Sequence, residues 1–281
     1  MPAANRTPTI YEPTATGLPP LRPYLNELVE RRRFIWHLAR TDLKAEHYDT
    51  AIGQLWVILD PLLMAAVYFF FRSVIRPAAS TADRNAILSH LFWAVFFFTY
   101  THNSLSTGAR SVLQGRVLIL NSAFPRAVLP LVAVVKSALD FMPTLFVYLV
   151  LHAILGQPFG ASLIFLPLIV GIQTVLNLGL GMLFAPLMVF FRDTSGFLPY
   201  ITRMWLYMTP ALYSIKEIPR GLVAYLRWNP LYPLFGALEQ VFRGRMPSKY
   251  YLLAAGSWAT VIFLLGAVVF LARERDFAVR L

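Results

Sequence analysis

The sequence contains no cysteine, so this chain can form neither a disulfide bond nor a thiolate metal site. Charged residues are also scarce, at 14%, whereas 57% of the residues are hydrophobic and the mean hydropathy is +0.58. An ordinary soluble domain has about 25% charged residues, so the composition excludes that class. These values are typical of an integral membrane protein.

Lysine is rare as well, and it occurs only as Lys44, Lys136, Lys216 and Lys249. None of these lysines follows a glycine, whereas the phosphate-binding loop of ATPases requires a Gly-Lys pair. The histidines share no spacing that suits a metal, and the acidic residues are scattered. We therefore expect no catalytic residue, no metal site and no cofactor bound by this chain.

Apolar runs account for most of the sequence. They cover residues 55–71, 87–100, 128–155, 163–191, 198–213 and 250–272. A membrane-spanning helix needs about 20 apolar residues, and the second and fifth runs reach that length only with their polar flanks. We predict an all-α integral membrane protein whose transmembrane domain, residues 51–281, has six transmembrane helices. No internal repeat is visible, so a symmetric pathway would need a second copy of the chain.

The N-terminal part of the chain has two predicted segments. Residues 1–22 are rich in Pro, Thr and Ala, which predicts a disordered tail. Residues 23–50 have apolar residues at spacings of three and four, which predicts an amphipathic helix. Trp36 with nearby arginines is typical of a helix in the membrane interface; the alternative is an ordinary soluble helix.

The net charge of +11 favours contact with anionic lipid headgroups, because no nucleic-acid-binding motif is present. Arginines before the first apolar run favour a cytoplasmic N-terminus by the positive-inside rule. Six spans then place the C-terminus on the same side. The bias is modest, since two predicted outer loops also contain arginines. We expect a multi-pass protein of the plasma (inner) membrane with both termini cytoplasmic.

Several charged residues lie inside or beside the apolar runs. Arg192 and Asp193 separate the fourth and fifth runs and predict a tight helical hairpin, although such a pair can simply mark the water boundary. Asp60 lies inside the first run, which is costly unless it faces protein or water; a buried polar contact and a position near the interface both remain open. Lys136 and Asp140 can neutralise each other at i, i+4 spacing. We predict structural roles for all five residues.

Two segments between the runs are neither free loops nor spans. Residues 109–126 are too polar to cross the membrane and too apolar for a loop, which predicts a short amphipathic helix that docks onto another protein. Residues 216–249 contain four prolines that separate short apolar helices. Two half-helices that dip into the outer leaflet would satisfy their backbones. We predict re-entrant extracellular gate helices between spans five and six, with Trp228, Asn229, Pro230 and Tyr232 as gate residues.

Aromatic residues are abundant in the second run. Such rings usually face lipid or neighbouring helices. The alternative is that some of them line a passage in which flat apolar faces slide along sugar rings. The candidates for channel lining are Tyr68, Phe69, Trp93, Phe97, Trp205 and Tyr207.

Short motifs occur in a specific order. They are Gly53–Gln54–Leu55–Trp56 with Asp60–Pro61, Phe124–Pro125–Arg126 with Leu129–Pro130, residues 178–193 (LGLGMLFAPLMVFFRD), Pro210 and Asn229–Pro230. In this order and spacing, the chain from about residue 24 onward resembles the permease subunit of ABC-2-type exporters for O-antigen, teichoic acid and related polysaccharides such as cell-wall galactan. One departure is Glu239, near which similar permeases often carry a basic residue.

The resemblance implies a homodimer that encloses a channel, driven by separate nucleotide-binding ATPase subunits that use ATP and Mg. The chain is then no enzyme by itself, and its cargo is a lipid-linked glycan exported from the cytoplasm. Residues 109–126 become a cytoplasmic coupling helix, with ATPase-coupling candidates Arg110, Arg116, Phe124, Pro125 and Arg126. The candidates for attracting the glycolipid pyrophosphate at the inner interface are Arg31, Arg32 and Arg33.

Two other functions fit parts of the sequence. The first is an ABC-2 permease whose cargo is a drug or a lipid, because aromatic rings do not identify a substrate. The second is an integral membrane glycosyl- or acyltransferase. That chemistry would need a cluster of carboxylates or histidines at one interface, and the scattered acids and histidines do not suggest one.

Overall fold

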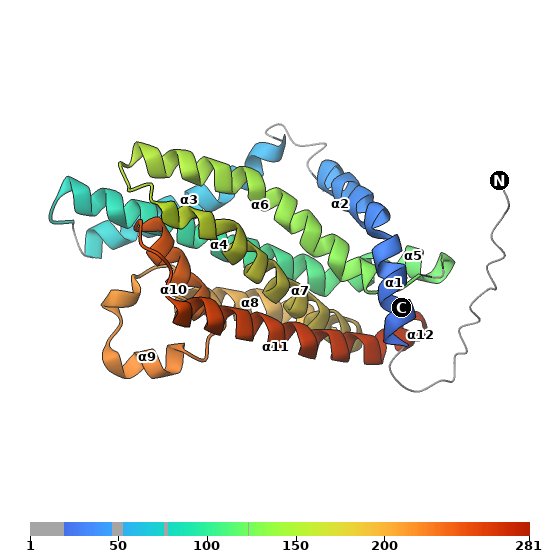
Figure 1. Ribbon diagram of the computed structural model, residues 1–281. Coiled ribbons are helices and arrows are strands. Elements are labelled where there is room, and N and C mark those ends of the chain that lie inside the picture. The colour runs from blue at the N-terminus through green and yellow to red at the C-terminus, as the bar shows by residue number, and fades with distance from the viewer. Residues whose placement is uncertain (1–19, 47–52, 76–77, 123) are drawn as a thin grey trace.

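The computed structural model describes residues 20–46, 53–75, 78–122 and 124–281, and all regular secondary structure in these ranges is helical. The predicted all-α class is confirmed for them. The longest helices run side by side along one axis (Figure 1). They are α3 (Trp56–Ile75), α4 (Thr81–Gln114), α6 (Val128–Ile154), α7 (Leu166–Phe190) and α11 (Lys249–Arg273).

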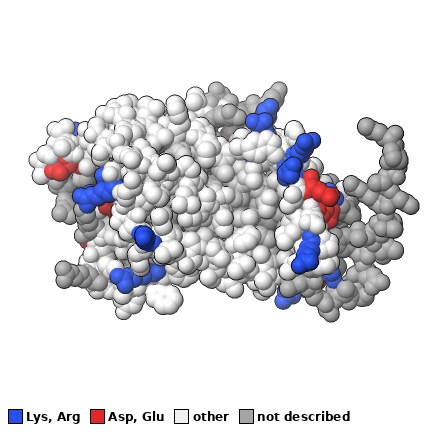
Figure 2. All heavy atoms as spheres, in the orientation of Figure 1, with Lys and Arg blue, Asp and Glu red and all other residues white. Residues whose placement is uncertain are grey.

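Four stretches among the described residues are long and apolar enough to cross a membrane. They are Trp56–Val74, Val128–Ile154, Ala161–Phe190 and Lys249–Arg280. Charged side chains gather at the two ends of the visible face and leave a wide uncharged band between them (Figure 2). Because charges are costly in hydrocarbon, this distribution fits a multi-pass membrane protein. The second and fifth predicted runs fall in α4 and α8 (Thr194–Met208), and the six-span count stays a prediction.

Helix α4 is longer than the sequence suggested. It has 34 residues, which correspond to a length of about 51 Å. Its polar second half lies against α7. The side-chain amide nitrogen of Gln173 in α7 donates hydrogen bonds to the backbone oxygen of Phe97 and to Oγ1 of Thr101, both at 2.8 Å. Thr101 is fully buried. Hydropathy did not predict this continuation, because a neighbouring helix satisfies these polar groups.

Helix α7 packs closely against α4 and α11 through glycines. A Cβ atom on Gly108 of α4 would lie 2.8 Å from the Cα atom of Gly181. A Cβ atom on Gly179 would lie 2.5 Å from the backbone nitrogen of Phe263 in α11. Small residues allow such close approach between membrane helices, so Gly179 and Gly181 are packing residues of this segment.

The predicted amphipathic helix at residues 23–50 is divided at Arg31 into α1 (Leu21–Glu30) and α2 (Arg32–Glu46). One face of this pair packs onto the bundle through Tyr24, Ile35 and Ala39. Trp36 lies on the other face, exposed, with the Arg40 guanidinium 5.0 Å from its ring centre. An interfacial position fits this division and stays a prediction. The predicted tail at residues 1–22 falls almost wholly outside the described residues.

The predicted hairpin between the fourth and fifth runs is confirmed. Helix α7 ends at Phe190 and α8 begins at Thr194, and Arg192 and Asp193 are exposed in the turn. The remaining elements are short. They are η1 (Gly53–Leu55), α5 (Arg116–Asn121), η2 (Ala161–Phe165), η3 (Ile215–Glu217), α9 (Arg220–Leu226), α10 (Leu231–Phe242), η4 (Glu274–Asp276) and α12 (Phe277–Arg280).

The bundle has two different ends (Figure 1). Helices α1, α5 and α12 lie at one end, together with the C-terminus, and we call this the terminal end. Helices α9 and α10 lie at the opposite end, together with the end of α3 and the start of α4, and we call this the distal end. The predicted coupling segment and the predicted gate are therefore separated by the length of the bundle.

Candidate functional site

Three segments that are far apart in the sequence meet at the terminal end. The hydroxyl of Tyr24 in α1 donates a hydrogen bond to Oε2 of Glu274 in η4 at 2.6 Å. The same hydroxyl oxygen accepts a hydrogen bond from the backbone nitrogen of Ala127 at 3.2 Å. Arg126 donates from Nη1 to the backbone oxygen of Glu274. We call these four residues the terminal node.

An apolar cluster supports the terminal node. Phe124 and Ala127 are buried in the same cluster as Phe270 of α11 and Phe277 of α12. The ring centres of Phe270 and Phe277 lie 5.3 Å apart, and the two rings meet edge to face. Burial of this much aromatic surface stabilises the join between the coupling segment and the C-terminal helices. The position of the coupling segment is therefore fixed by the fold of the chain itself.

The five predicted coupling residues divide into two groups. Phe124 and Pro125 are buried and Arg126 is half-buried, so these three hold the segment in place. Arg110 at the end of α4 and Arg116 at the start of α5 are exposed. Only the exposed pair presents charge to a partner protein. Contact with an ATPase stays a prediction for both of them.

A cavity of 600 Å³ lies between α2 and the coupling segment. Asp42 of α2, Thr107 of α4 and Lys136 of α6 contribute polar groups to its wall, and Leu118 of α5 contributes apolar surface. Both the predicted structural residue Lys136 and the predicted coupling helix therefore border this one cavity. Because both polar and apolar side chains line this cavity, the lining does not indicate one class of ligand.

The three predicted inner-interface arginines are not equivalent. Arg31 lies at the break between α1 and α2 and forms an ion pair with Glu27 at 2.8 Å. Arg32 and Arg33 are exposed at the start of α2. An arginine that is already paired attracts a second anion less strongly. Arg32 and Arg33 are therefore the better candidates for a phosphate, and that role stays a prediction.

Helices α3 and α8 bring several predicted lining residues together. Tyr68 and Phe69 of α3 are half-buried, and Tyr207 of α8 is exposed. Tyr68 and Tyr207 lie close enough for their hydroxyl groups to interact. The guanidinium of Arg84 lies 5.8 Å from the centre of the Phe69 ring. These three rings form one partly exposed aromatic surface on α3 and α8.

Trp93 and Phe97 lie elsewhere, and their predicted channel lining needs correction. They are only 2% and 0% exposed. The ring of Trp93 lies 5.6 Å from both Phe235 and Phe242 of α10, and Phe97 lies 4.9 Å from Phe141 of α6. In this structure they are packing residues, because α10 covers the face of α4 on which they lie.

The predicted structural charges occupy different environments. Asp60 is exposed on α3 and close enough to His102 of α4 to interact with it electrostatically. Lys136 and Asp140 are half-buried on α6. A buried contact of Asp60 at the channel or at a dimer seam would need a second copy of the chain and stays a prediction. Its exposed carboxylate lies on the same helix as Tyr68 and Phe69.

Asn229 joins α8 to α10 at the distal end. Its Oδ1 accepts hydrogen bonds from the indole nitrogen of Trp205 at 2.8 Å and from the backbone nitrogen of Leu231 at 3.0 Å. Its Nδ2 donates to the backbone oxygen of Met208 at 3.0 Å and to Oγ1 of Thr209 at 3.1 Å. The side-chain amide thus uses both donor hydrogens and both acceptor positions. Trp205, a predicted lining residue, contributes its indole to this join.

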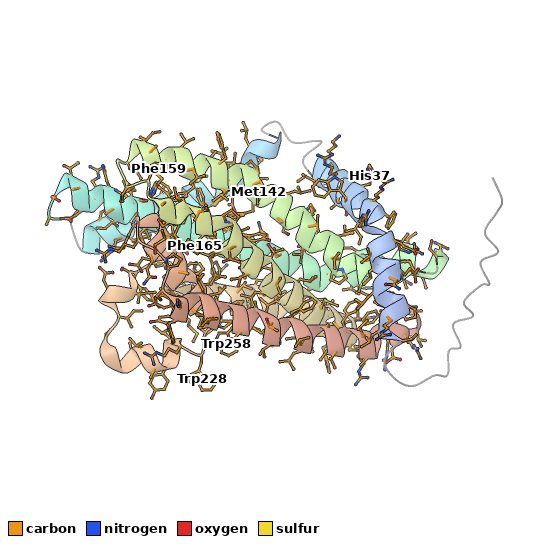
Figure 3. The ribbon with its side chains drawn as sticks, viewed as in Figure 1. His37, Met142, Phe159, Phe165, Trp228 and Trp258 are labelled. Carbon is orange, nitrogen blue, oxygen red and sulfur yellow. The ribbon has the colours of Figure 1, made fainter. Side chains whose placement is uncertain are left out.

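The two predicted gate helices differ in their surroundings. Helix α10 is buried along nearly its whole length and packs against α7 and α11. Pro230 immediately precedes it, and Tyr232 in its first turn is buried. Helix α9 is exposed, and Trp228 after it is 78% exposed and lies at the edge of the molecule, away from the long helices (Figure 3). The gate role stays a prediction for both helices.

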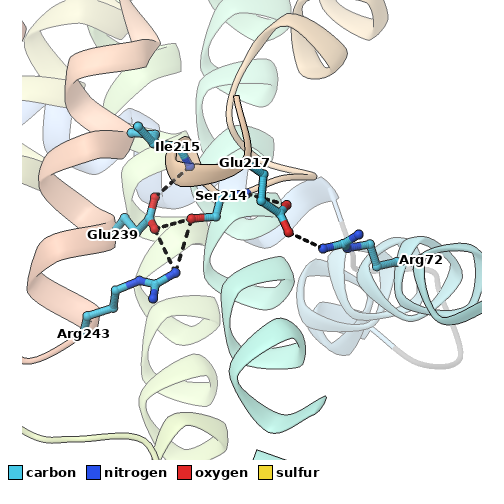
Figure 4. A network of polar contacts seen from close by, with 6 residues as sticks. All are labelled: Arg72, Ser214, Ile215, Glu217, Glu239 and Arg243. Atoms are coloured by element: carbon cyan, nitrogen blue, oxygen red, sulfur yellow. Dashed lines mark hydrogen bonds and ion pairs between the residues drawn. The ribbon is translucent and has the colours of Figure 1, made fainter. Parts of the chain in front are cut away.

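Sequence reasoning missed a polar network beside α10. Glu239 was singled out only as a departure from similar permeases, and its partners Ser214 and Arg243 were not identified (Figure 4). One signal was available, because Glu239 is the only acidic residue in the apolar segment from Leu231 to Phe242. Glu274 of the terminal node had no comparable signal within its arginine-rich surroundings.

Comparison with known proteins gives a consistent result. The ABC-2 type transporter family matches residues 34–242. The O-antigen export system permease protein RfbA of Myxococcus xanthus is 28% identical over 260 residues, which are 90% of this chain and 97% of that protein. The protein of the same name from Klebsiella pneumoniae is 26% identical over 242 residues, 86% of this chain and 92% of that protein. The family match includes α5, α8 and α10, and the chain belongs to the ABC-2 type transporter family.

Proposed function

We propose that this chain is the permease subunit of an ATP-driven exporter that moves a lipid-linked polysaccharide from the cytoplasm across the inner membrane. The observation that carries this proposal is similarity to O-antigen export permeases over 86–90% of the chain. The family match, residues 34–242, includes α5 at the terminal end and α10 at the distal end. A cargo of polymer, rather than a drug or a single lipid, follows from the names of these relatives.

The proposed complex contains two copies of this chain and a separate ATPase. The sequence has no Gly-Lys pair of a phosphate-binding loop, so ATP and Mg belong to the partner. The ATPase docks at the terminal end, against α5. Exposed Arg110 and Arg116 pair there with acidic residues of the ATPase, and the terminal node holds the docking segment in position. Both termini are cytoplasmic in this arrangement.

The path of coupling follows α4. This helix runs from the distal end to the coupling segment without interruption over 34 residues. At the distal end its Trp93 packs against Phe235 and Phe242 of α10. A rigid helix transmits displacement along its length, so movement of α5 by the ATPase shifts α10 through α4. Because these aromatic rings are closely packed, a shift of Trp93 displaces the rings of α10 directly.

The translocation path lies between the two copies. Aromatic residues of α3 and α8 face it: Tyr68 and Phe69, which are half-buried in the single chain, and Tyr207, which is exposed. Flat rings offer sugar units apolar contact without hydrogen bonds that would hold the polymer too tightly to move. Arg32 and Arg33 attract the pyrophosphate of the lipid carrier at the inner interface.

The proposal is tested by depleting this chain in its native host. We expect surface polysaccharide to disappear while lipid-linked glycan accumulates inside the inner membrane, and an ATPase-inactive partner should give the same result. Sugar analysis of the accumulated lipid identifies the polymer, a galactan or another. Unchanged surface polysaccharide, or accumulation of a drug or a simple lipid instead, would contradict the proposal.

A further inference from the structure

The turn between α8 and α9 is attached to α10 by a buried carboxylate (Figure 4). Glu239 is 6% exposed. Its Oε1 accepts a hydrogen bond from the hydroxyl of Ser214 at 2.5 Å, and its Oε2 accepts one from the backbone nitrogen of Ile215 at 3.2 Å. Arg243, one helical turn further along α10, forms an ion pair with Glu239 at 2.9 Å and donates to Ser214 Oγ at 3.3 Å. Both carboxylate oxygens of Glu239 therefore accept hydrogen bonds from the turn.

The same turn is attached to α3 by a second carboxylate. Ser214 and Glu217 form a capping box around η3, in which the backbone nitrogen of Ser214 donates to Oε2 of Glu217 at 3.3 Å. The other oxygen of Glu217, Oε1, lies 2.6 Å from Nη2 of Arg72 in the last turn of α3. The turn thus connects two helices that are far apart in the sequence.

The two attachments differ in strength. The Glu239 carboxylate is buried and neutralised, and breaking such a contact leaves an uncompensated buried charge. The Arg72 and Glu217 side chains are 22% and 32% exposed, and partly exposed pairs are weak. A cavity of 360 Å³ borders them and is lined by Arg72, Glu217 and Arg243. Solvent in this hollow can solvate both ions once they separate.

From this difference we infer that the Arg72–Glu217 pair is a breakable clasp, which holds the distal end of α3 closed against the turn. Glu239 is the positioning residue of the clasp, because it fixes the turn that carries Glu217 to α10. When the clasp opens, the turn stays with α10 and α3 moves away, so the distal end widens. This inference rests on the proposed function, in which cargo leaves through the distal end.

The inference also gives a physical reason for the acid at position 239. A basic side chain there could not accept hydrogen bonds from the Ser214 hydroxyl and the Ile215 backbone nitrogen. In this chain the turn depends on a carboxylate. Loss of Glu239 should therefore displace Glu217 even though the two residues do not pair with each other.

The absence of cysteine permits a direct test by site-directed spin labelling. Cysteines at Val74 of α3 and at Met246 after α10, both exposed, report the separation of the two elements. Labelled full-length permease is diluted with unlabelled chain and placed in lipid nanodiscs without ATP or cargo. Distances are then measured by double electron–electron resonance in the parent, R72Q, E217Q and the R72Q/E217Q double variant.

We expect each single variant to raise the population of the longer distance about fivefold, the upper range for a partly exposed pair. The double variant should show no further increase, since either change already opens the clasp. E239L should match E217Q, and E239Q, which keeps an acceptor for Ser214, should give a smaller shift. R245Q, a matched loss of charge beside the Met246 label, should leave the distances unchanged.

Unchanged distances in R72Q and E217Q would overturn the inference, as would an additive effect in the double variant. The measurement uses neither ATP nor glycan, so its failure is distinguishable from failure of the proposed function. A second readout in the complex with its ATPase separates a clasp from simple packing. Opening the clasp should raise ATP turnover in the absence of glycan, and unchanged turnover in variants with shifted distances would refute a role in gating.

Discussion

The hydroxyl of Tyr24 lies 2.6 Å from a carboxylate oxygen of Glu274, although 250 positions separate these residues in the sequence. Both side chains are buried, and the hydroxyl oxygen also accepts the backbone hydrogen of Ala127. The Tyr24 hydroxyl therefore connects α1, η4 and the backbone at Ala127, next to the predicted coupling segment. This contact holds the segment around Ala127 against both ends of the chain.

Replacing Tyr24 with phenylalanine tests that contact. The change removes the hydrogen bond to Glu274 and leaves the buried Ala127 nitrogen without its acceptor, so we expect the stability of the purified protein to fall by about 1–3 kcal/mol. Thermal unfolding in detergent measures the loss. Tyr225→Phe is the matched control, because Tyr225 is exposed on α9. Equal stability of the two variants would refute the role of the node.

Reversing the charge of Arg116 tests docking to the ATPase. Arg116 is exposed on α5, so Arg116→Glu should change stability by less than about 0.5 kcal/mol. Binding of the ATPase should weaken by about tenfold or more, since like charges would then face each other. Titration of ATPase onto nanodisc-embedded permease measures this affinity.

Two other arginines provide the controls for that experiment. Arg192→Glu makes the same change in the α7–α8 turn and should bind the ATPase normally. Arg126→Glu should behave differently from both, because it places a carboxylate next to Glu274 and should lower the unfolding temperature. Normal ATPase binding by Arg116→Glu would show that α5 is not the docking element.

Adding one methyl group at Gly179 tests the contact between α7 and α11. The new Cβ would lie 2.5 Å from the Phe263 nitrogen, so the two helices must separate. We expect Gly179→Ala to cost about 1–3 kcal/mol, as overpacking does. Gly171→Ala on the same helix meets open space and should be neutral or slightly stabilising. A thermal-shift comparison of the two variants in one lipid mixture decides the matter, and similar melting of both would contradict the packing.

Asn229 provides a test at the distal end. Asn229→Ala removes the acceptor of Trp205 and Leu231 and the donor to Met208 and Thr209. We expect a loss of about 1–3 kcal/mol and faster hydrogen exchange at the end of α8 and the start of α10. Trp228→Ala, which truncates an exposed ring, should exchange like the parent. If exchange changes equally in both variants, Asn229 does not join the two helices.

The apolar runs predicted much of the fold because composition alone identifies a membrane helix. The runs at residues 128–155 and 163–191 correspond to α6 and α7, and the turn at Arg192 and Asp193 was correctly predicted as a hairpin. The full length of α4 was not predictable in this way. Its Thr101 hydroxyl and Phe97 backbone oxygen accept hydrogen bonds from Gln173, which lies more than 70 positions away, and a hydropathy window does not include such partners.

The candidate site was predicted less completely, for a physical reason. Whether an aromatic ring lines a passage depends on what covers it, and α10 covers Trp93 and Phe97 but leaves Tyr207 exposed. Helix α10 has only 12 residues, so its length gave no sign that it is buried. Contacts such as that of Tyr24 with Glu274 depend on the register of the whole bundle, which periodicity does not determine.

Reconstitution of the purified proteins tests the proposed export of a lipid-linked polysaccharide by this chain and a separate ATPase. The permease would be purified together with a candidate ABC ATPase from the same organism, and ATP turnover would be measured with and without lipid-linked glycan from that organism. We expect a stable complex whose ATP turnover rises when glycan is added, and we expect Arg116→Glu to abolish that response. Failure of the two proteins to associate, or turnover that ignores the glycan, would contradict the proposed function.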